Sequence, residues 1–177
     1  MKFACNTQAL LLSAAVLCST TAAVAQAAAS DDDKHFVETA LKGGMAEVEL
    51  GKLAADKGAS EDVKQFGQRM VADHEKLSEK MKAVAGQIGV TPPSMTAVSD
   101  MAEKTELEVL SGKSFDDAYI KAMLKDHQQD LDDFKKESAS ASSPAVKRAA
   151  RQGETVISEH LAMIRKIAEA HNVTASN

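Results

Sequence analysis

The sequence predicts an all-α protein, a bundle of four long helices. Aromatic residues make up only 3% of the chain and tryptophan is absent, so the aromatic residues that favour strands are scarce. Apolar residues recur every three or four positions over long stretches, as one face of a helix requires. Proline and glycine divide these stretches into segments of helical length.

The first 25 residues are predicted to be a signal peptide that precedes the bundle. Lys2 gives a basic start, an apolar stretch follows at residues 9–17, and Ala23–Ala25 offers an A-x-A cleavage site. Cleavage there would release a mature chain that begins at Gln26. We expect this chain to be exported to the periplasm of a Gram-negative cell envelope.

Both cysteines of the chain lie within this leader. Cys18 ends the apolar stretch and makes a lipoprotein leader the alternative, although the bulky Leu17 before it disfavours lipidation. If the leader is removed, the mature chain contains no thiol. Disulfides, cysteine nucleophiles and thiolate metal sites are then excluded.

The charge of the mature chain argues against some classes of partner. It carries 20 basic and 26 acidic side chains, a net charge of about −6, because Lys2 is the only charged residue of the leader. The two signs are interspersed without a basic stripe, so nucleic acid is not expected as a partner. No later segment has the roughly 18 uncharged apolar residues of a membrane-spanning helix. We expect one domain at 33–172, between a flexible lead-in at 26–32 and a disordered tail at 173–177.

Helix signals place the first two long helices. The first should span residues 33–57, because acidic residues suit its N-terminus and Gly58 supplies a stop. The second should run from the N-cap residue Ser60 to about residue 88, where Gly89 ends it. These two helices are joined by only a few residues.

The second half of the bundle follows a Thr-Pro-Pro break at residues 91–93. A short helix is expected over 96–110. The third long helix should span 114–138, with the serine at its start as a cap. After a turn at 138–143, the fourth should run over 144–171, since proline suits the first position of a helix.

Loop lengths predict how these helices are arranged. Helices one and two, and helices three and four, are joined by short turns, so each pair should form an antiparallel hairpin. About 25 residues, including the short helix, separate helices two and three, which is enough to cross the bundle and make them parallel. Four helices with one long crossover, here carrying a short extra helix, define the ferritin-like topology.

Each predicted helix has an ionisable residue within its apolar face, and these residues are Glu47, His74, His127 and His160. His74, for example, follows Met70 and precedes Leu77 in a stripe spaced by threes and fours. Glu47 and His74 are centred near residue 60, and His127 and His160 near residue 143, so each lies about 13 to 16 residues from the centre of its turn, or roughly 20 Å along a helix. If helices two and three are parallel, all four side chains should meet at the middle of the bundle.

A buried cluster of one carboxylate and three imidazoles must be satisfied by hydrogen bonds or by a ligand. As ligands, these four residues would suit a single transition metal ion such as Zn, Fe or Mn, with Ni and Cu also open. As a metal-free network, they would fix the register of the helices at some cost in stability. The sequence leaves both interpretations open, together with the case in which the four do not converge.

A di-iron centre does not follow from the sequence. Such a site needs a Glu on each of two helices and Glu-x-x-His on the other two. The residues three positions before the histidines are instead apolar: Val71, Leu124 and Ile157. A single-metal site is the remaining metal hypothesis.

The other candidate residues carry weaker signals. Three acidic residues directly precede the histidines and are expected to face a neighbouring helix or solvent: Asp73, Asp126 and Glu159. Glu49 is a weaker candidate for a second carboxylate ligand and is expected to be exposed. His35 and His171 lie near helix ends and are expected at the surface. The methionines recur at core spacing, so we interpret them as packing residues rather than copper ligands.

Several stretches resemble a known family of bacterial exported proteins. They are Met45–Ala54, Met70–His74, Gly112–Tyr119, Asp126-His127 and Glu159–Leu161. In this order they are similar to the domain-of-unknown-function family 4142, whose members are similar to ferritin-like bundles and are often labelled outer membrane proteins. The resemblance covers about residues 33–171. It implies a ferritin-like fold with Glu47, His74, His127 and His160 as recurring polar positions, and it implies no metal, substrate or reaction.

Three functions follow as hypotheses. The first is an exported periplasmic ferritin-like protein whose Glu/His cluster binds a metal ion or a small ligand. The second is a non-catalytic structural or interaction protein of the cell envelope, in which the cluster only fixes helix register. The third, a metal-dependent oxidase, would need an open coordination position and a channel for its substrate. No residue is predicted to be catalytic.

Overall fold

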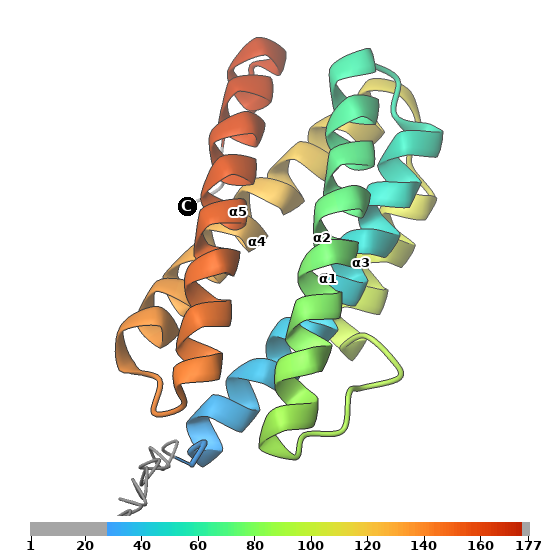
Figure 1. Cartoon of the computed structure of the whole chain (residues 1–177). Helices are drawn as coiled ribbons and strands as arrows, with labels where there is room; N and C mark the ends of the chain where they lie inside the picture. The colour runs from blue at the N-terminus through green and yellow to red at the C-terminus, as the bar shows by residue number, and fades with distance from the viewer. Residues whose placement is uncertain (1–27, 175–177) are drawn as a thin grey trace, which may run out of the picture.

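The computed structural model describes residues 28–174 of the chain. These residues form five α-helices, joined by loops, and no strand (Figure 1). They are α1 (Asp31–Lys57), α2 (Glu61–Ile88), α3 (Val98–Glu108), α4 (Gly112–Ser140) and α5 (Pro144–His171). The all-α prediction is confirmed. The predicted signal peptide at 1–25 lies outside the described residues, as do residues 26–27 of the lead-in and 175–177 of the tail. Within residues 28–174, no helix is both long enough and apolar enough to cross a membrane.

The four long helices form two hairpins, α1 with α2 and α4 with α5, which pack against each other (Figure 1). The crossover between α2 and α4 runs from one end of the bundle to the other, so these two helices point in the same direction. Helix α3 lies within the crossover and contacts both α1 and α4. Because α2 packs more closely on α5 than α1 packs on α4, the looser side of the bundle lies between α1 and α4.

Two helices begin earlier than their sequence signals suggest. Helix α1 starts at Asp31 because Ser30 caps it: the Oγ of Ser30 accepts from the N–H of Asp33 at 3.1 Å, and the Asp33 carboxylate accepts from the N–H of Ser30 at 3.0 Å. Helix α4 starts at Gly112 rather than at residue 114, with Ser111 at the N-cap position. It also continues to residue 140, which shortens the turn predicted at 138–143.

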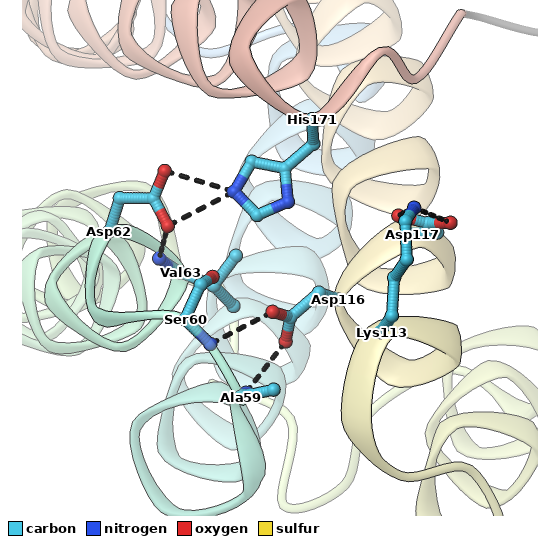
Figure 2. Close-up of polar contacts among 8 residues, drawn as sticks. All are labelled: Ala59, Ser60, Asp62, Val63, Lys113, Asp116, Asp117 and His171. Carbon is cyan, nitrogen blue, oxygen red and sulfur yellow. Dashed lines mark hydrogen bonds and ion pairs between the residues drawn. The ribbon is translucent and has the colours of Figure 1, made fainter.

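Two aspartates join the hairpins at opposite ends of the bundle. Asp116 of α4 accepts from the backbone N–H groups of residues 59–60, in the α1–α2 turn, at 2.8 and 2.9 Å (Figure 2). Asp33 of α1 accepts from the N–H groups of residues 142–143, in the α4–α5 turn, at 3.0 and 2.9 Å. Each carboxylate therefore satisfies backbone donors at the start of a helix in the other hairpin.

These contacts belong to an internal structural repeat. Asp33 and Asp116 are 83 residues apart, and so are the two turns that they cap. The C-terminal ends of α1 and α4, and both ends of α2 and α5, are related by the same spacing. The left-handed residues that end α2 and α5, Gly89 and Asn172, are related in the same way. The two hairpins are therefore equivalent halves of the fold.

The core follows the predicted apolar stripes in α2, α4 and α5, whose residues are buried almost throughout. In α1 the buried face carries Val37 and Leu41, whereas the adjacent Phe36 and Ala40 are partly exposed. Helices α1 and α2 approach closely where two glycines meet: a Cβ on Gly67 would lie 2.6 Å from the carbonyl oxygen of the facing Gly51. Only a residue without a side chain allows this approach.

Candidate metal centre

Three histidines meet in the interior of the bundle, one each from α2, α4 and α5. His74, His127 and His160 are at most 2% exposed. One ring nitrogen from each lies within 4.8 Å of the other two, and the ring centroids are 5.3 to 5.9 Å apart. The helical spacing that places a histidine in each apolar stripe thus brings three imidazoles to one level.

The histidines of α4 and α5 each use one ring nitrogen in a hydrogen bond to a group outside the cluster. His127 Nδ1 donates to the carbonyl oxygen of Met123 at 3.0 Å. His160 Nε2 donates to the Asp73 carboxylate at 3.2 Å, and Asp73 is also paired with the Arg69 side chain. Because the donor nitrogen carries the proton in a neutral imidazole, the other nitrogen of each ring is a lone-pair acceptor.

These remaining nitrogens have no hydrogen-bond partner. Nε2 of His127, Nδ1 of His160 and both nitrogens of His74 are buried and unpaired. Phe66 packs edge-on against two of the rings, with its centroid 6.3 Å from His127 and 6.2 Å from His160, and Met70 beside it is fully buried. Four unpaired nitrogens in an apolar environment carry an unfavourable desolvation energy.

Burial also determines the charge of the three rings. It lowers the pKa of His127 to about 3, with the positive charge of His160 adding to the effect. The pKa of His74 is driven well below its usual value, first by burial and then by its two histidine neighbours. Burial lowers the pKa of His160 as well, although the contact with Asp73 opposes it. All three are therefore neutral at neutral pH, which is the form that binds metals.

Glu47 lies beside the three histidines but outside the set of converging nitrogens. Its Oε1 is 3.7 Å from Nδ1 of His127, the nitrogen that donates to the backbone, and its Oε2 has no partner. The side chain is only 4% exposed. Burial raises the pKa of Glu47 well above its usual value, and the charges of Asp130, Asp126 and Glu103 add to this. Of the four residues predicted to meet, the three histidines bring their ring nitrogens together, and Glu47 lies next to them.

A cleft of about 770 Å³ opens between α1 and α4 and reaches His74 and Glu47. We call it the α1–α4 cleft. Residues of α3 and the segment before it line one side. Its lining includes eight Asp or Glu side chains and three Lys side chains, so its net charge is negative when these carboxylates are ionised. A cleft with this charge and low-dielectric walls attracts cations.

Asp73 was expected to face a neighbouring helix or solvent, and the sequence assigned it no part in the site. It faces α5, as a residue adjacent to a core position can, and holds His160 through a hydrogen bond. Burial acts to raise the pKa of Asp73, but the hydrogen bonds from His160 and Arg69 outweigh it and keep that pKa below its usual value. Asp73 is thus a carboxylate that orients a buried imidazole. The feature of the sequence that could have identified this role is the position of Asp73 directly before a core histidine.

The minor candidates have other roles. Glu49 pairs with Lys104 of α3 at 2.9 Å, so it joins α1 to the crossover and is not near the histidines in the described contacts. His35 is exposed, as predicted. His171 is not simply a surface residue, because its Nε2 contacts the Asp62 carboxylate at 3.0 Å and fastens the end of α5 to the start of α2 (Figure 2). Glu159 is exposed and lies 3.7 Å from Arg69.

The donor set also decides which kind of metal centre fits. Leu124 and Ile157, three positions before two of the histidines, are buried apolar side chains, and Val71 before His74 is partly buried. Among the described residues, the only group of three or more ligand-type side chains with converging atoms is the three histidines. None of these three positions within the described residues supplies the Glu of a Glu-x-x-His pair, so the residues do not fit a di-iron centre. They fit one ion held by imidazole.

The fold and the site together define a ferritin-like helical protein with a buried three-histidine cluster. Residues 18–167 match the family described as "Domain of unknown function (DUF4142)", and the chain belongs to this family. The resemblance noted in the sequence is confirmed. No functionally curated protein matches the chain.

Solved structures of two other proteins share the fold over most of the chain. A DUF305 fragment from Deinococcus radiodurans is 16% identical, with a TM-score of 0.71 over 81% of this chain and 99% of that one. A DUF305 protein from Streptomyces coelicolor, provisionally described as secreted, is 15% identical, with a TM-score of 0.69 over 82% and 97%.

A third structure supplies the link to the ferritin-like class. It is a two-domain protein from Anabaena variabilis that contains DJ-1/ThiJ/PfpI-like and ferritin-like domains. It is 16% identical, with a TM-score of 0.60 over 84% of this chain and 40% of that one. The present chain therefore spans less than half of that protein, and at these identities the likenesses show the fold alone.

Proposed function

We propose that this protein binds a single transition metal ion through His74, His127 and His160. The observation that carries the proposal is the pairing of the ring nitrogens. In two rings one nitrogen is held by a hydrogen bond and the other is left unpaired, and both nitrogens of the third ring are unpaired. One nitrogen from each ring lies within 4.8 Å of the other two. Metal-bound histidines have this arrangement, because the outer hydrogen bond fixes the tautomer and the orientation of the ring.

The donor chemistry favours some ions over others. Three neutral imidazoles suit Zn, Cu, Fe and Ni, whereas Mn prefers oxygen donors. Zinc–nitrogen bonds are about 2.0–2.1 Å long, and three nitrogens within 4.8 Å of one another are near enough for one ion to contact all of them. Three protein ligands leave a further coordination position for water or a small ligand, and the α1–α4 cleft reaches His74.

A metal-free network that only fixes helix register is the alternative function. In such a network the buried polar atoms should bond one another. The unpaired nitrogens of the three histidines, and the unpaired Oε2 of Glu47, argue for a ligand instead. The site alone does not favour catalysis, so we propose binding rather than an enzymatic reaction.

We also propose that the protein is exported to the periplasm. The leader pattern at residues 1–25 supports this, and so does the likeness to a protein provisionally described as secreted. The test is N-terminal sequencing of the protein recovered from the periplasmic fraction. A mature chain starting at Gln26 is expected, and an intact leader on a cytoplasmic protein would contradict export.

Metal analysis tests the proposed binding site. Protein reconstituted with Co²⁺ and freed of loose ions should retain one ion per chain and show the visible absorption of nitrogen-coordinated cobalt. A variant carrying His74→Ala and His127→Ala should retain none, whereas His35→Ala, which removes an exposed histidine, should behave as the parent. Retention of the ion by the double variant, or no bound ion in the folded parent, would overturn the proposal.

A further inference from the structure

The α1–α4 cleft carries acidic side chains from three helices. Glu103 comes from α3, Asp126 and Asp130 come from α4, and Glu47 of α1 lies at the depth of His74. Glu103 and Asp126 are hydrogen-bonded to each other across α3 and α4. The carboxylates thus extend from the crossover side of the cleft toward the three histidines.

Glu47 is the deepest of these carboxylates, and it is an isolated polar group. It is 96% buried, its Oε2 has no hydrogen-bond partner, and it lines the cleft. The charges of Asp130, Asp126 and Glu103 all act on it, so the four side chains share one electrostatic environment. An unpaired buried carboxylate among other carboxylates is unfavourable unless a proton or a cation neutralises it.

We propose that the α1–α4 cleft is the path by which a hydrated divalent cation reaches the three histidines. Glu103 and Asp130 attract the ion, and Glu47 receives it before it passes to His74. Carboxylate oxygens replace part of the water shell of the ion, which allows it to move between apolar helix faces without losing all its ligands at once. This inference rests on the proposed function.

The carboxylates form a path rather than a second closed site. Within residues 28–174, only the histidines bring three ligand atoms within 4.8 Å of one another. The acidic side chains are instead distributed along the cleft, from α3 to the interior. Such a distribution suits successive, weak contacts with a moving ion, whereas the clustered imidazoles suit its retention.

The rate of metal loading tests the path. Co²⁺ would be mixed rapidly with the metal-free protein near pH 8, and the absorption of the bound ion would be recorded over time. This pH lies above the pKa of about 7 of Glu103 and Asp130. A variant carrying Glu103→Gln and Asp130→Asn should load about three- to tenfold more slowly at low salt, as electrostatic attraction predicts. High salt should remove most of the difference by screening. Glu47→Gln should also slow loading.

The matched control is Asp132→Asn. It makes the same change of charge as Asp130→Asn, on the same helix and two residues away, but its side chain is exposed and does not line the cleft. It should load at the parent's rate. Equal loading rates in the Glu103→Gln, Asp130→Asn variant and in Asp132→Asn would overturn the path while leaving the histidine site intact, since bound cobalt would still be seen.

A second measurement does not depend on the histidines. In a His74→Leu variant, paramagnetic Mn²⁺ should broaden the amide resonances of residues along the α1–α4 cleft, because the carboxylates still gather the ion. Adding Glu103→Gln and Asp130→Asn should remove the broadening, and adding Asp132→Asn should not. Broadening spread evenly over the surface would overturn the path even if the histidines proved to bind no metal.

Discussion

His160 donates a hydrogen bond from Nε2 to the Asp73 carboxylate across the interface of α5 and α2, at 3.2 Å. This contact leaves Nδ1 of the same ring unpaired, and one nitrogen of the ring lies within 4.8 Å of nitrogens of His74 and His127. The helices therefore fix both the tautomer and the direction of a buried imidazole before any ion is bound. Preorganisation of this kind lowers the cost of binding.

Replacing Asp73 by Asn tests the role of this contact. The variant can still accept a hydrogen bond, but it no longer makes the imidazole a stronger donor to the metal. Loss of such an outer carboxylate typically weakens metal affinity 10- to 100-fold, and we expect this range in a Co²⁺ titration. Glu159→Gln is the control, because Glu159 is exposed and should not matter. Equal affinities of the two variants would show that Asp73 does not orient a ligand.

Replacing His74 by Leu separates a metal site from a structural network. Both nitrogens of His74 are buried without a partner, so an apolar side chain of similar size should remove their desolvation penalty. We expect the metal-free protein to gain about 1–3 kcal/mol in free energy of unfolding and to lose metal binding. Urea denaturation of the metal-free proteins measures the first effect. A large loss of stability would favour the network interpretation.

Ionisation of Asp130 should make stability depend on pH. The pKa of Asp130 is raised from 3.8 to about 7, first by burial and then by neighbouring carboxylates. In this range the folded protein holds a proton that the unfolded chain has lost, so stability falls as the pH rises from about 4 through 7. Asp130→Asn should therefore become more stable relative to the parent over that interval. Denaturation at several pH values measures this, and Asp132→Asn should show no comparable trend.

The close approach of α1 and α2 predicts the effect of adding a methyl group. In Gly67→Ala the new Cβ would lie 2.6 Å from the backbone oxygen of Gly51, so the helices must separate, at a cost of about 1–3 kcal/mol. In Gly86→Ala, on the same helix, nothing lies within 4 Å of the new Cβ. There the better helix propensity of Ala should stabilise the protein by up to about 1 kcal/mol. In thermal unfolding, Gly67→Ala should lower the melting temperature and Gly86→Ala should raise it. Equal changes in the two variants would contradict the packing account.

The sequence predicted the helices and the level of the histidines well, for a physical reason. Apolar periodicity fixes which face of a helix is buried, and distance from a turn fixes height along the bundle, so His74, His127 and His160 were assigned to one layer. The helix starts were less accurate because Ser30 and Ser111 compete with other residues as caps.

The sequence could not determine how each side chain is turned within that layer. Glu47 lies at the right level but beside the Nδ1 of His127, and the role of Asp73 depends on a contact with a different helix. Both contacts depend on how each helix is rotated about its own axis and on how far it lies from its neighbours. These two quantities depend on local packing, such as the close approach of Gly51 and Gly67. The same is true of the α1–α4 cleft, which exists because α1 and α4 pack loosely.

X-ray absorption spectroscopy of the protein loaded with one equivalent of Zn²⁺ is the most direct test of the three-histidine site. The account predicts an inner shell of about four ligands near 2.0–2.1 Å, with the multiple-scattering pattern of three imidazoles that is lost in the His74→Leu variant. An oxygen-only shell without imidazole scattering, or an identical spectrum in that variant, would contradict it.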